Sequence, residues 1–539
     1  MSKVQTLEYK EKLISEIKGF KEKGESFLRK ELTVAEFKGI SGGMGVYAQK
    51  GGEQFMLRLR VSSGILSREY SDLILRLAEK FGIEKLHLTT RQAIQLHDLN
   101  LDEVCEIMEE SIRNGLYTRG GGGNFPRNVA LSPLSGVEKG EAFDVTPFAV
   151  CTGEYLMEHI TEYRLPRKFK IAYSNGGRDN AGCTSTDLGF LAVVKEGKPY
   201  FKVYLAGGLG NNPAFGIELK ELIEPSKALH YVEAAIRLFM AEGDYQNKGK
   251  ARLRYVPVRI GEEAFLDAFY DKLKEVEGDD SFTEFAEEFA ACDTKIEKNT
   301  KTNQEVISPD KGEVILEQKQ ESLFAVRIHP ICGQFKISDF KILRDFMDEI
   351  LEAEKENNTP DIRLSMDESL FVRNLTKKQA EILLDKLAAM NMVISLSRSI
   401  SCVGTPSCQV GMIASQELIH AALDYMKAEG INPNRLPQLS VSGCLNSCAR
   451  HQISPLGFTG IKRRVDNEPV DAFDLHICGS SLEGACHLGK MVGSMRKKDI
   501  PAFLGKLAAT LENLDKEYTD YANDMEEDFL KLIDEFKIS

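Results

Sequence analysis

Phe55-Met-Leu-Arg-Leu-Arg-Val61 is the stretch from which the fold can be read. Its apolar residues alternate with arginines, so one face of a predicted strand carries leucines and the other carries Arg58 and Arg60. The pattern then changes to helical spacing, with apolar residues recurring every three or four positions. The unit continues as a helix, a strand and a second helix, at 70–81, 85–90 and about 101–114.

The second half of the chain repeats this unit. Phe324, Val326 and Ile328 again alternate with other residues, which predicts a second strand of the same kind. Helix, strand and helix follow in the same order, at 340–350, 362–365 and 376–390. Further on, Leu-Pro pairs at 165–166 and 436–437 lead to Gly-Phe pairs at 189–190 and 457–458, so the repeat extends beyond the first unit.

We therefore predict an α+β chain with an internal duplication, in which two ferredoxin-like half-domains are each followed by an α+β core domain. A polar, acid-rich stretch between the halves is typical of a linker. The predicted boundaries are 1–50 for an N-terminal helical arm, 51–118 for half-domain 1, 119–275 for core domain 1, 276–312 for the linker, 313–395 for half-domain 2, 396–510 for core domain 2 and 511–539 for a C-terminal helical tail.

Composition limits the class of protein. The 539 residues are 42% hydrophobic and 28% charged, which is ordinary for a globular protein. No apolar run reaches the ~18 residues of a membrane span, and the charged N-terminus lacks the apolar core of a signal peptide. Eleven cysteines in such a chain indicate thiols and metal ligands in a reducing cytoplasm. A net charge of −13 argues against broad affinity for nucleic acid or anionic lipid, so an anionic substrate would need a locally basic pocket.

Four cysteines form two close pairs near the C-terminus. Cys402 and Cys408 are separated by five residues, Cys444 and Cys448 by three, and 35 residues lie between the pairs. Four thiolates suit an iron–sulfur cluster or tetrahedral zinc, although zinc ribbons usually have two residues between paired cysteines. Buried thiols that merely pack are the third possibility. Spacing and ligand type favour a [4Fe–4S] cluster.

A set of cations marks the first half. Arg58 and Arg60 leave one strand face, and Lys168 and Lys170 leave another at alternate positions. Arg127 follows the glycine run Gly120–Gly123, which allows close approach of backbone to a ligand. Any one of these cations alone would be a solvated surface charge. As a set in otherwise apolar strands they favour an anion-binding pocket, because clustered like charges need a compensating anion.

These residues resemble the bridged sirohaem–[4Fe–4S] site of the sulfite and nitrite reductase haemoprotein family. The resemblance covers roughly 50–510 and is closest to a ferredoxin-type sulfite reductase. It includes Leu-Arg-Leu-Arg at 57–60, Leu-Thr-Thr-Arg-Gln at 88–92, Pro-Arg-Asn-Val at 126–129, Leu-Pro-Arg-Lys-Phe-Lys at 165–170, Asp-Leu-Gly-Phe at 187–190, Gly-Gly-Leu-Gly at 207–210 and Lys-Ala-Arg-Leu-Arg-Tyr at 250–255. The glycine run at 120–123 departs from the usual family sequence.

The resemblance assigns roles residue by residue. It implies that all four cysteines ligate the cluster and that Cys448 also bridges to the sirohaem iron. It implies cofactor contacts for Arg91, Gln95, His97 and Arg450, although a lone histidine such as His97 is more often a core residue. The substrate-binding cations it implies are Arg58, Arg127, Lys168 and Lys170.

The expected reaction is the six-electron reduction of sulfite to sulfide. Within the family, the position of Lys170 leans toward lysine in sulfite reductases and toward asparagine in many plant and cyanobacterial nitrite reductases. Sulfite also carries more negative charge than nitrite near neutral pH, so an extra cation favours it. Ferredoxin-dependent reduction of nitrite to ammonia is the alternative.

The electrons are expected from a ferredoxin or flavoprotein donor, since the sequence shows no flavin or nicotinamide domain. A basic docking patch is expected at 462–464 or 496–498, with solvated surface charge as the alternative. Two rival classes stay open: an electron-transfer protein that has lost the haem, and a module for sirohaem delivery. Cys478 and Cys486 fit no ligand spacing and are expected to be ordinary thiols.

Overall fold

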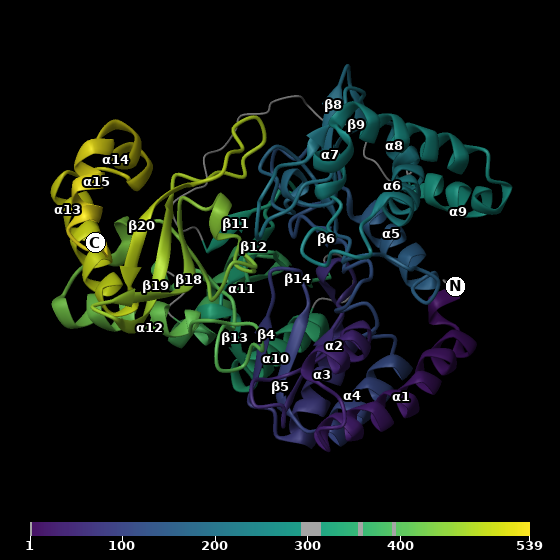
Figure 1. Ribbon diagram of the computed structural model, residues 1–539, viewed down its shortest axis with the longest axis horizontal. Coiled ribbons are helices and arrows are strands. Elements are labelled where there is room, and N and C mark those ends of the chain that lie inside the picture. Colours follow the sequence, from purple (N-terminus) through teal and green to yellow (C-terminus); the bar gives the residue numbers. More distant parts are fainter. Residues whose placement is uncertain (1–2, 293–313, 354–358, 391–394, 539) are drawn as a thin grey trace.

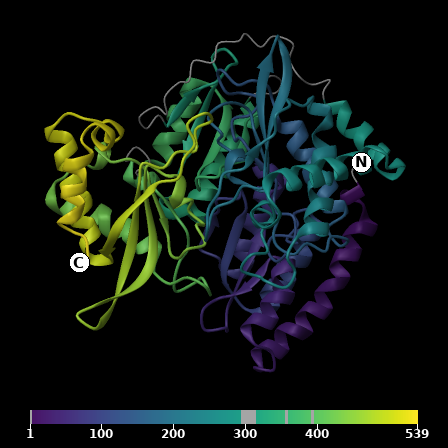
Figure 2. The ribbon, with the colours of Figure 1, turned by 45° about the horizontal axis from the view of Figure 1, so that its top comes forward.

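The computed structural model describes residues 3–292, 314–353, 359–390 and 395–538. Figure 1 shows the two core domains on opposite sides of the molecule, with the ferredoxin-like units between and below them. The view in Figure 2 shows the same separation after a 45° turn. The predicted α+β class and its duplication are confirmed, because four five-stranded sheets form two matching pairs.

Each ferredoxin-like sheet borrows one strand from the opposite half. The first sheet has the order β1-β2-β5-β4-β13, and the second has the order β11-β12-β15-β14-β3. The first contains β1 Val46–Ala48, β2 Phe55–Leu59, β4 Lys85–Leu88, β5 Ile94–Leu99 and the borrowed β13 Gln334–Lys336. The second contains β11 Ile315–Glu317, β12 Phe324–Ile328, β14 Asp361–Leu364, β15 Leu370–Leu375 and the borrowed β3 Ile65–Leu66. The exchange interlocks the halves.

The two ferredoxin-like units also share one hydrophobic core. Leu57 and Leu59 of β2 are fully buried in it, together with Val326 and Ile328 of β12. Helices from both halves cover it: α3 Arg68–Phe81, α4 Leu101–Arg113, α10 Ile337–Ala353 and α11 Lys377–Lys386. Burial of apolar side chains is the main contribution to the stability of such a unit, so the two halves are expected to fold together.

The core domains have parallel and antiparallel strands in one sheet. The first has the order β10-β9-β8-β7-β6 and the second β16-β17-β18-β19-β20. Their strands are β6 Ala130–Leu131, β7 Ile171–Ser174, β8 Leu188–Lys195, β9 Lys198–Leu205, β10 Ile217–Glu218, β16 Ile400–Ser401, β17 Leu439–Ser442, β18 Leu456–Val465, β19 Glu468–Ile477 and β20 Lys490–Arg496. In both sheets the short first strands run parallel and the following hairpin is antiparallel, which repeats the topology.

Helices enclose each core sheet. The first has α5 Thr146–Glu158, α6 Ala228–Glu242, α7 Tyr255–Ile260, α8 Glu262–Glu277 and α9 Asp280–Ala290; the second has α12 Ser415–Glu429, α13 Ile500–Asn513, α14 Tyr518–Asp524 and α15 Glu526–Asp534. At the N-terminus, α1 Leu7–Leu28 and α2 Val34–Ser41 pack against half-domain 1, where the rings of Phe27 and Phe37 stack at 4.4 Å. None of the helices in the described ranges combines the length and apolar content of a membrane span.

The predicted linker at 276–312 does not begin as a linker. Helix α9 occupies 280–290, because Asp279 caps it and Phe282 and Phe289 give it an apolar face. That face packs on α5, with the ring of Phe289 5.6 Å from that of Phe148. The sequence did not predict this helix, because its apolar residues are spread among acidic ones. Residues 293–312 lie outside the described part of the chain.

One turn shows how the copies have diverged. Gln92, between β4 and β5, donates its amide to the carbonyls of Leu131 and Leu364 and accepts the Leu131 N–H. Glu368 holds the matching position between β14 and β15, and its carboxyl accepts the Ser401 N–H at 2.9 Å. Both residues have positive φ. Glu368 is 1% exposed, and burial raises its pKa well above the usual range. A protonated carboxylic acid in half 2 therefore occupies the position that the Gln92 amide has in half 1.

Glu368→Gln should change how stability depends on pH. Because the folded pKa lies above the unfolded value of about 4.3, ionisation destabilises the wild-type fold as pH rises through that window, by about 1.4 kcal/mol for each pH unit. Gln cannot ionise, so the variant should gain unfolding free energy relative to wild type with rising pH. Urea unfolding over a pH series measures this, with exposed Glu381→Gln as control. A pH-independent difference would contradict the assignment.

Candidate functional site

Lys168 and Lys170 lie immediately before β7 and flank a buried phenylalanine. Phe169 is fully buried and pairs with Pro126, which brings the glycine run and Arg127 alongside the two lysines. The Lys170 backbone N–H donates to the Asp187 carboxylate at 2.9 Å. The predicted alternation therefore places both ammonium groups on one side of the segment, facing the other cations of the set.

The glycine run holds two of the predicted substrate-binding arginines. Arg127 donates to the carbonyls of Gly120 at 3.2 Å, of Gly123 at 2.8 Å, and of Gly122. Arg58 donates to the Gly121 carbonyl at 2.5 Å. All four carbonyls thus point at guanidinium groups, which concentrates partial negative charge where the cations would otherwise repel one another.

Gln95 and His97 lie behind Arg58. With the Gln95 amide oriented to satisfy both neighbours, its oxygen accepts from Arg58 at 2.5 Å and its nitrogen donates to His97 Nε2 at 3.1 Å. Burial lowers the pKa of His97 to about 4, so the imidazole is neutral and can accept that bond. The structure places both residues as supports of Arg58, and a direct contact with a cofactor stays a prediction.

Arg60 has a different place from Arg58. It is 5% exposed and donates to the carbonyls of Pro126 at 3.2 Å and of Arg127 at 3.1 Å. Burial lowers the pKa of Arg60 to about 10, but the two carbonyls satisfy its guanidinium. It braces the backbone that carries Arg127 and is not part of the pocket wall.

Arg91 and Arg450 offer buried N–H groups. Arg91 donates to the carbonyls of Asn128 at 2.7 Å and Ile171 at 3.1 Å, while its Nε has no partner in the described part of the chain. Arg450, from the opposite half, has an unpartnered buried Nη2. Burial lowers the pKa of both, to about 9 for Arg91. Unpaired buried guanidinium donors are costly, so these two residues fit a ligand that carries carboxylates.

The cations act on one another strongly. Burial, together with the charges of Arg252 and Arg127, lowers the pKa of Lys168 to about 7. Burial, Lys168 and Arg91 hold the pKa of Lys170 well below the usual range. Both lysines therefore hold their protons loosely, and a bound anion would favour the charged forms.

Asp187 and Arg252 were not among the predicted site residues. Asp187 is fully buried, and its carboxylate accepts from Arg252 at 2.8 and 3.0 Å and from the Lys170 backbone. It is the carboxylate that opposes the charges of Arg91 and Lys170. Both residues belong to motifs quoted above, Asp-Leu-Gly-Phe and Lys-Ala-Arg-Leu-Arg-Tyr. Their position in these motifs is the sequence feature that could have identified them as site residues.

The cysteines follow the parallel strands of the second core sheet. Cys402 comes directly after β16, and Cys444 and Cys448 lie in the turn after β17. The Gly443 carbonyl accepts the N–H groups of Met412 and Ile413 at 2.9 and 3.1 Å, which joins the two cysteine loops. The sulfur of Cys402 accepts the Gly443 N–H at 3.2 Å. Hydrogen bonds of Gly443 therefore join the two cysteine loops, and convergence of the four thiols on one cluster stays a prediction.

The cysteine thiols would have to lose their protons to ligate a cluster. Burial raises the pKa of Cys402 to about 12 and also raises those of Cys408 and Cys444, and the charge of Cys448 adds to all three. The other three thiols therefore all lie within electrostatic reach of Cys448, although no three metal-ligating side chains in the described ranges converge on a single ion. A cubane places a separate iron at each cysteine, so its ligands need not touch. The donor set fits such a cluster.

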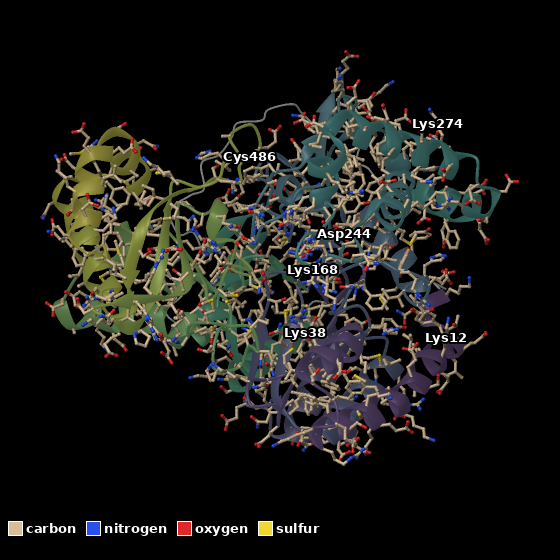
Figure 3. All side chains as sticks on the ribbon, viewed as in Figure 1. Lys12, Lys38, Lys168, Asp244, Lys274 and Cys486 are labelled. Atoms are coloured by element: carbon tan, nitrogen blue, oxygen red, sulfur yellow. The ribbon has the colours of Figure 1, made fainter. Side chains whose placement is uncertain are left out.

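The two halves meet at Cys448. The hydroxyl of Thr90, which precedes Arg91, donates to the Cys448 carbonyl at 2.8 Å. The charge of Cys448 also acts on Lys168, which Figure 3 labels near the centre of the molecule. A second bond between the halves runs from Gln409 to the Gln49 carbonyl at 3.0 Å. The cysteine loops thus face the cationic side chains, as the divergence of the two copies predicts.

The two basic triplets are partly neutralised within the fold. Lys462 pairs with Asp471, Lys497 pairs with Glu417, and Arg463 donates to Asp474 at 3.3 Å. Their use as a docking patch stays a prediction. Cys478 and Cys486 are half-buried, and neither joins a group of three possible metal ligands in the described ranges.

Asp187→Asn should destabilise the protein strongly. The change leaves the buried Arg252 guanidinium without its charge partner, which is expected to cost about 3–5 kcal/mol of unfolding free energy. Asp271→Asn is the control, because Asp271 pairs with Lys274 on the surface, where such pairs contribute about 0–1 kcal/mol. Denaturant unfolding compares the two variants. A loss below about 1 kcal/mol in Asp187→Asn would contradict the role of this pair.

Comparisons with known proteins agree with this arrangement. Residues 47–112 match the family described as "Nitrite/Sulfite reductase ferredoxin-like half domain", and residues 122–276 match "Nitrite and sulphite reductase 4Fe-4S domain". The second match falls on core domain 1, which carries the cations, while the four cysteines lie in the other copy.

Curated relatives span most of the chain. A "Ferredoxin--nitrite reductase" of Synechococcus elongatus is 26% identical over 468 residues, covering 84% of this chain and 85% of the relative. A "Sulfite reductase [NADPH] hemoprotein beta-component" of Acidithiobacillus ferrooxidans is 25% identical over 446 residues, covering 76% and 74%. The solved structure of the NirA protein of Mycobacterium tuberculosis has a TM-score of 0.74 at 22% identity, covers 93% of this chain and 92% of that chain, and shows the same fold.

Proposed function

This chain belongs to the sulfite and nitrite reductase haemoprotein family, and we propose that within it the protein reduces sulfite to sulfide. Membership implies sirohaem and a [4Fe–4S] cluster as prosthetic groups. When bound, this pair supplies the site of anion reduction and the path for six electrons. Arg91 and Arg450 would hold the macrocycle carboxylates, and Cys402, Cys408, Cys444 and Cys448 would hold the cluster.

The choice of sulfite depends on Lys170. This second ammonium group lies beside Lys168 in a buried setting, with Arg127 and Arg252 close enough to lower the Lys168 pKa. Sulfite carries more negative charge than nitrite near neutral pH, so each additional cation in a site of low dielectric stabilises sulfite more.

The same residues can supply protons. A lysine with a lowered pKa gives up its proton readily, so Lys168 and Lys170, which are half-buried, can first compensate the bound oxyanion and then protonate its oxygens as S–O bonds break. Arg58 and Arg127 are held by the glycine carbonyls and keep their positions through this step. Preorganised donors of this kind need no rearrangement as charge develops.

Nitrite is the alternative substrate. One observation supports nitrite: the relative from Synechococcus elongatus has a name that specifies nitrite, and 85% of that relative is covered by the match. The donor is proposed to be a ferredoxin, which the name of the Synechococcus elongatus relative specifies, with a flavoprotein as the alternative.

Cys444→Ser tests the centre itself. Wild type produced with a sirohaem supply should show haem absorption, contain iron and acid-labile sulfide, and turn over sulfite with a reduced dye. The Ser variant removes one proposed cluster ligand, so iron, sulfide and turnover should fall together. Cys478→Ser is the matched control and should keep all three. Full iron and sulfide in Cys444→Ser would count against the assigned ligand set, and a haem-free but iron-containing wild type would favour an electron-transfer protein.

Lys170→Asn tests the substrate. Removing this ammonium should lower kcat/KM for sulfite by about 10²-fold and for nitrite by less, since the more highly charged anion loses more stabilisation. Dye-driven assays with each anion measure the ratio, and the exposed Lys198→Asn is the control. A larger loss for nitrite than for sulfite would reverse the choice of substrate.

A further inference from the structure

Tyr47 lies beside the anion pocket and has no part in the mechanism above. It is the central residue of β1, pairs with Met56 of β2, and is half-buried, so its phenol can still exchange protons with solvent. Arg58 is two residues beyond Met56 on the same strand, and side chains two apart in a strand share a face. The register therefore places the phenol on the face of the sheet that carries Arg58.

The phenol is packed against the glycine run. Its oxygen accepts the Gly123 N–H at 2.9 Å. A methyl group on Gly122 would come within 2.4 Å of that oxygen and 2.3 Å of the Gly42 carbonyl, so only glycine fits there. The carbonyls of the same run accept from Arg127 and Arg58. The phenol and both guanidinium groups are thus hydrogen-bonded to one four-residue segment.

The charges around Tyr47 favour its ionised form. Burial alone would raise its pKa, but the positive charges of Arg127 and Arg58, the Gly123 amide and Lys38 of α2 outweigh burial and lower it. Among the tyrosines whose pKa is displaced, Tyr47 is the one displaced downward. Its charge in turn acts on Arg127 to raise that pKa, against the effect of burial.

We propose that Tyr47 is the internal counter-group of the anion pocket, which releases its proton when the pocket is empty and takes one up when an oxyanion binds to Arg58 and Arg127. The proposal rests on the proposed function. An oxyanion cancels the positive potential that favours phenolate, so the phenolate oxygen forms an O–H bond with a proton delivered by a buffer acid. No electrons move in this step. Binding of the anion thereby brings a proton to the edge of the pocket before reduction begins.

Linkage fixes the sign of the pH dependence. Because the bound state favours the protonated phenol, anion affinity must fall as pH rises above the Tyr47 pKa of the empty site, by up to about tenfold per pH unit for one proton. Lys168 and Lys170 shift affinity in the same direction, Lys168 at about pH 7. A readout specific to tyrosine is therefore needed.

The experiment titrates the holoenzyme with nitrite, which does not itself titrate between neutral and alkaline pH. In wild type, nitrite should reduce the ultraviolet absorbance of tyrosinate, and its Kd should rise steeply in the alkaline range. Tyr47→Phe should lose the tyrosinate change and show a shallower alkaline rise in Kd, the remainder coming from the lysines, while keeping its haem and iron. Tyr518→Phe is the control, because it also loses a hydroxyl that is hydrogen-bonded to the backbone, here to the Pro455 carbonyl, and it should behave as wild type.

Equal tyrosinate signals in wild type and Tyr47→Phe would overturn the proposal, as would loss of haem or iron from Tyr47→Phe, which would make the residue a structural support. Either result leaves the proposed function standing if wild type binds and reduces an anion. A wild type that binds neither anion would overturn both. Gly122→Ala gives an independent arm, because the added methyl displaces the phenol, and it should also remove the tyrosinate signal.

Discussion

The exchange of β3 and β13 is the constraint on which the rest of this structure depends. Each short strand completes the sheet of the opposite half, and the two ferredoxin-like units bury one common core. The halves cannot separate without exposing that core and breaking both edge pairings. Because their relative position is set in this way, the turn that carries Thr90 and Arg91 reaches Cys448 in the other half.

The pocket that results is a compromise between burial and charge. Burial lowers the pKa of Arg91, Arg127, Lys168 and Lys170, and repulsion from neighbouring cations contributes to the same shift. Asp187 opposes part of this charge, and backbone carbonyls of the glycine run oppose more. The remaining unbalanced charge is the basis of the anion binding that we propose, since a bound oxyanion would relieve the repulsion.

Divergence of the copies follows the same logic. Where half 1 has Arg91, half 2 has Asp367 at the matching turn position, and Asp367 pairs with Arg327, the counterpart of Arg58. Half 2 therefore neutralises internally the charge that half 1 leaves for a ligand. Glu368 in place of Gln92 shows that the turn itself was kept, because a protonated acid satisfies the same kind of backbone partner as an amide.

The sequence by itself determined the duplication, the α+β class, the pairing of the four cysteines and the cationic character of half 1. These features follow from local periodicity and spacing, which act over a few residues. The sequence did not show α9 inside the expected linker, because its apolar face is spread among acidic residues. Nor did it separate Arg58, which faces the pocket, from Arg60, which braces the backbone, since the two alternate on the same predicted strand.

Only the tertiary structure decided which charges meet. Asp187 reaches Arg252 across 65 residues, Thr90 reaches Cys448 across 358, and the phenol of Tyr47 lies against a glycine run 76 residues away. No spacing rule predicts such contacts, because they depend on how the sheets pack and on which strands are exchanged. Those long-range partners decide whether a cation is neutralised by a carboxylate, bonded to backbone carbonyls, or left with N–H groups that have no protein partner within the described residues.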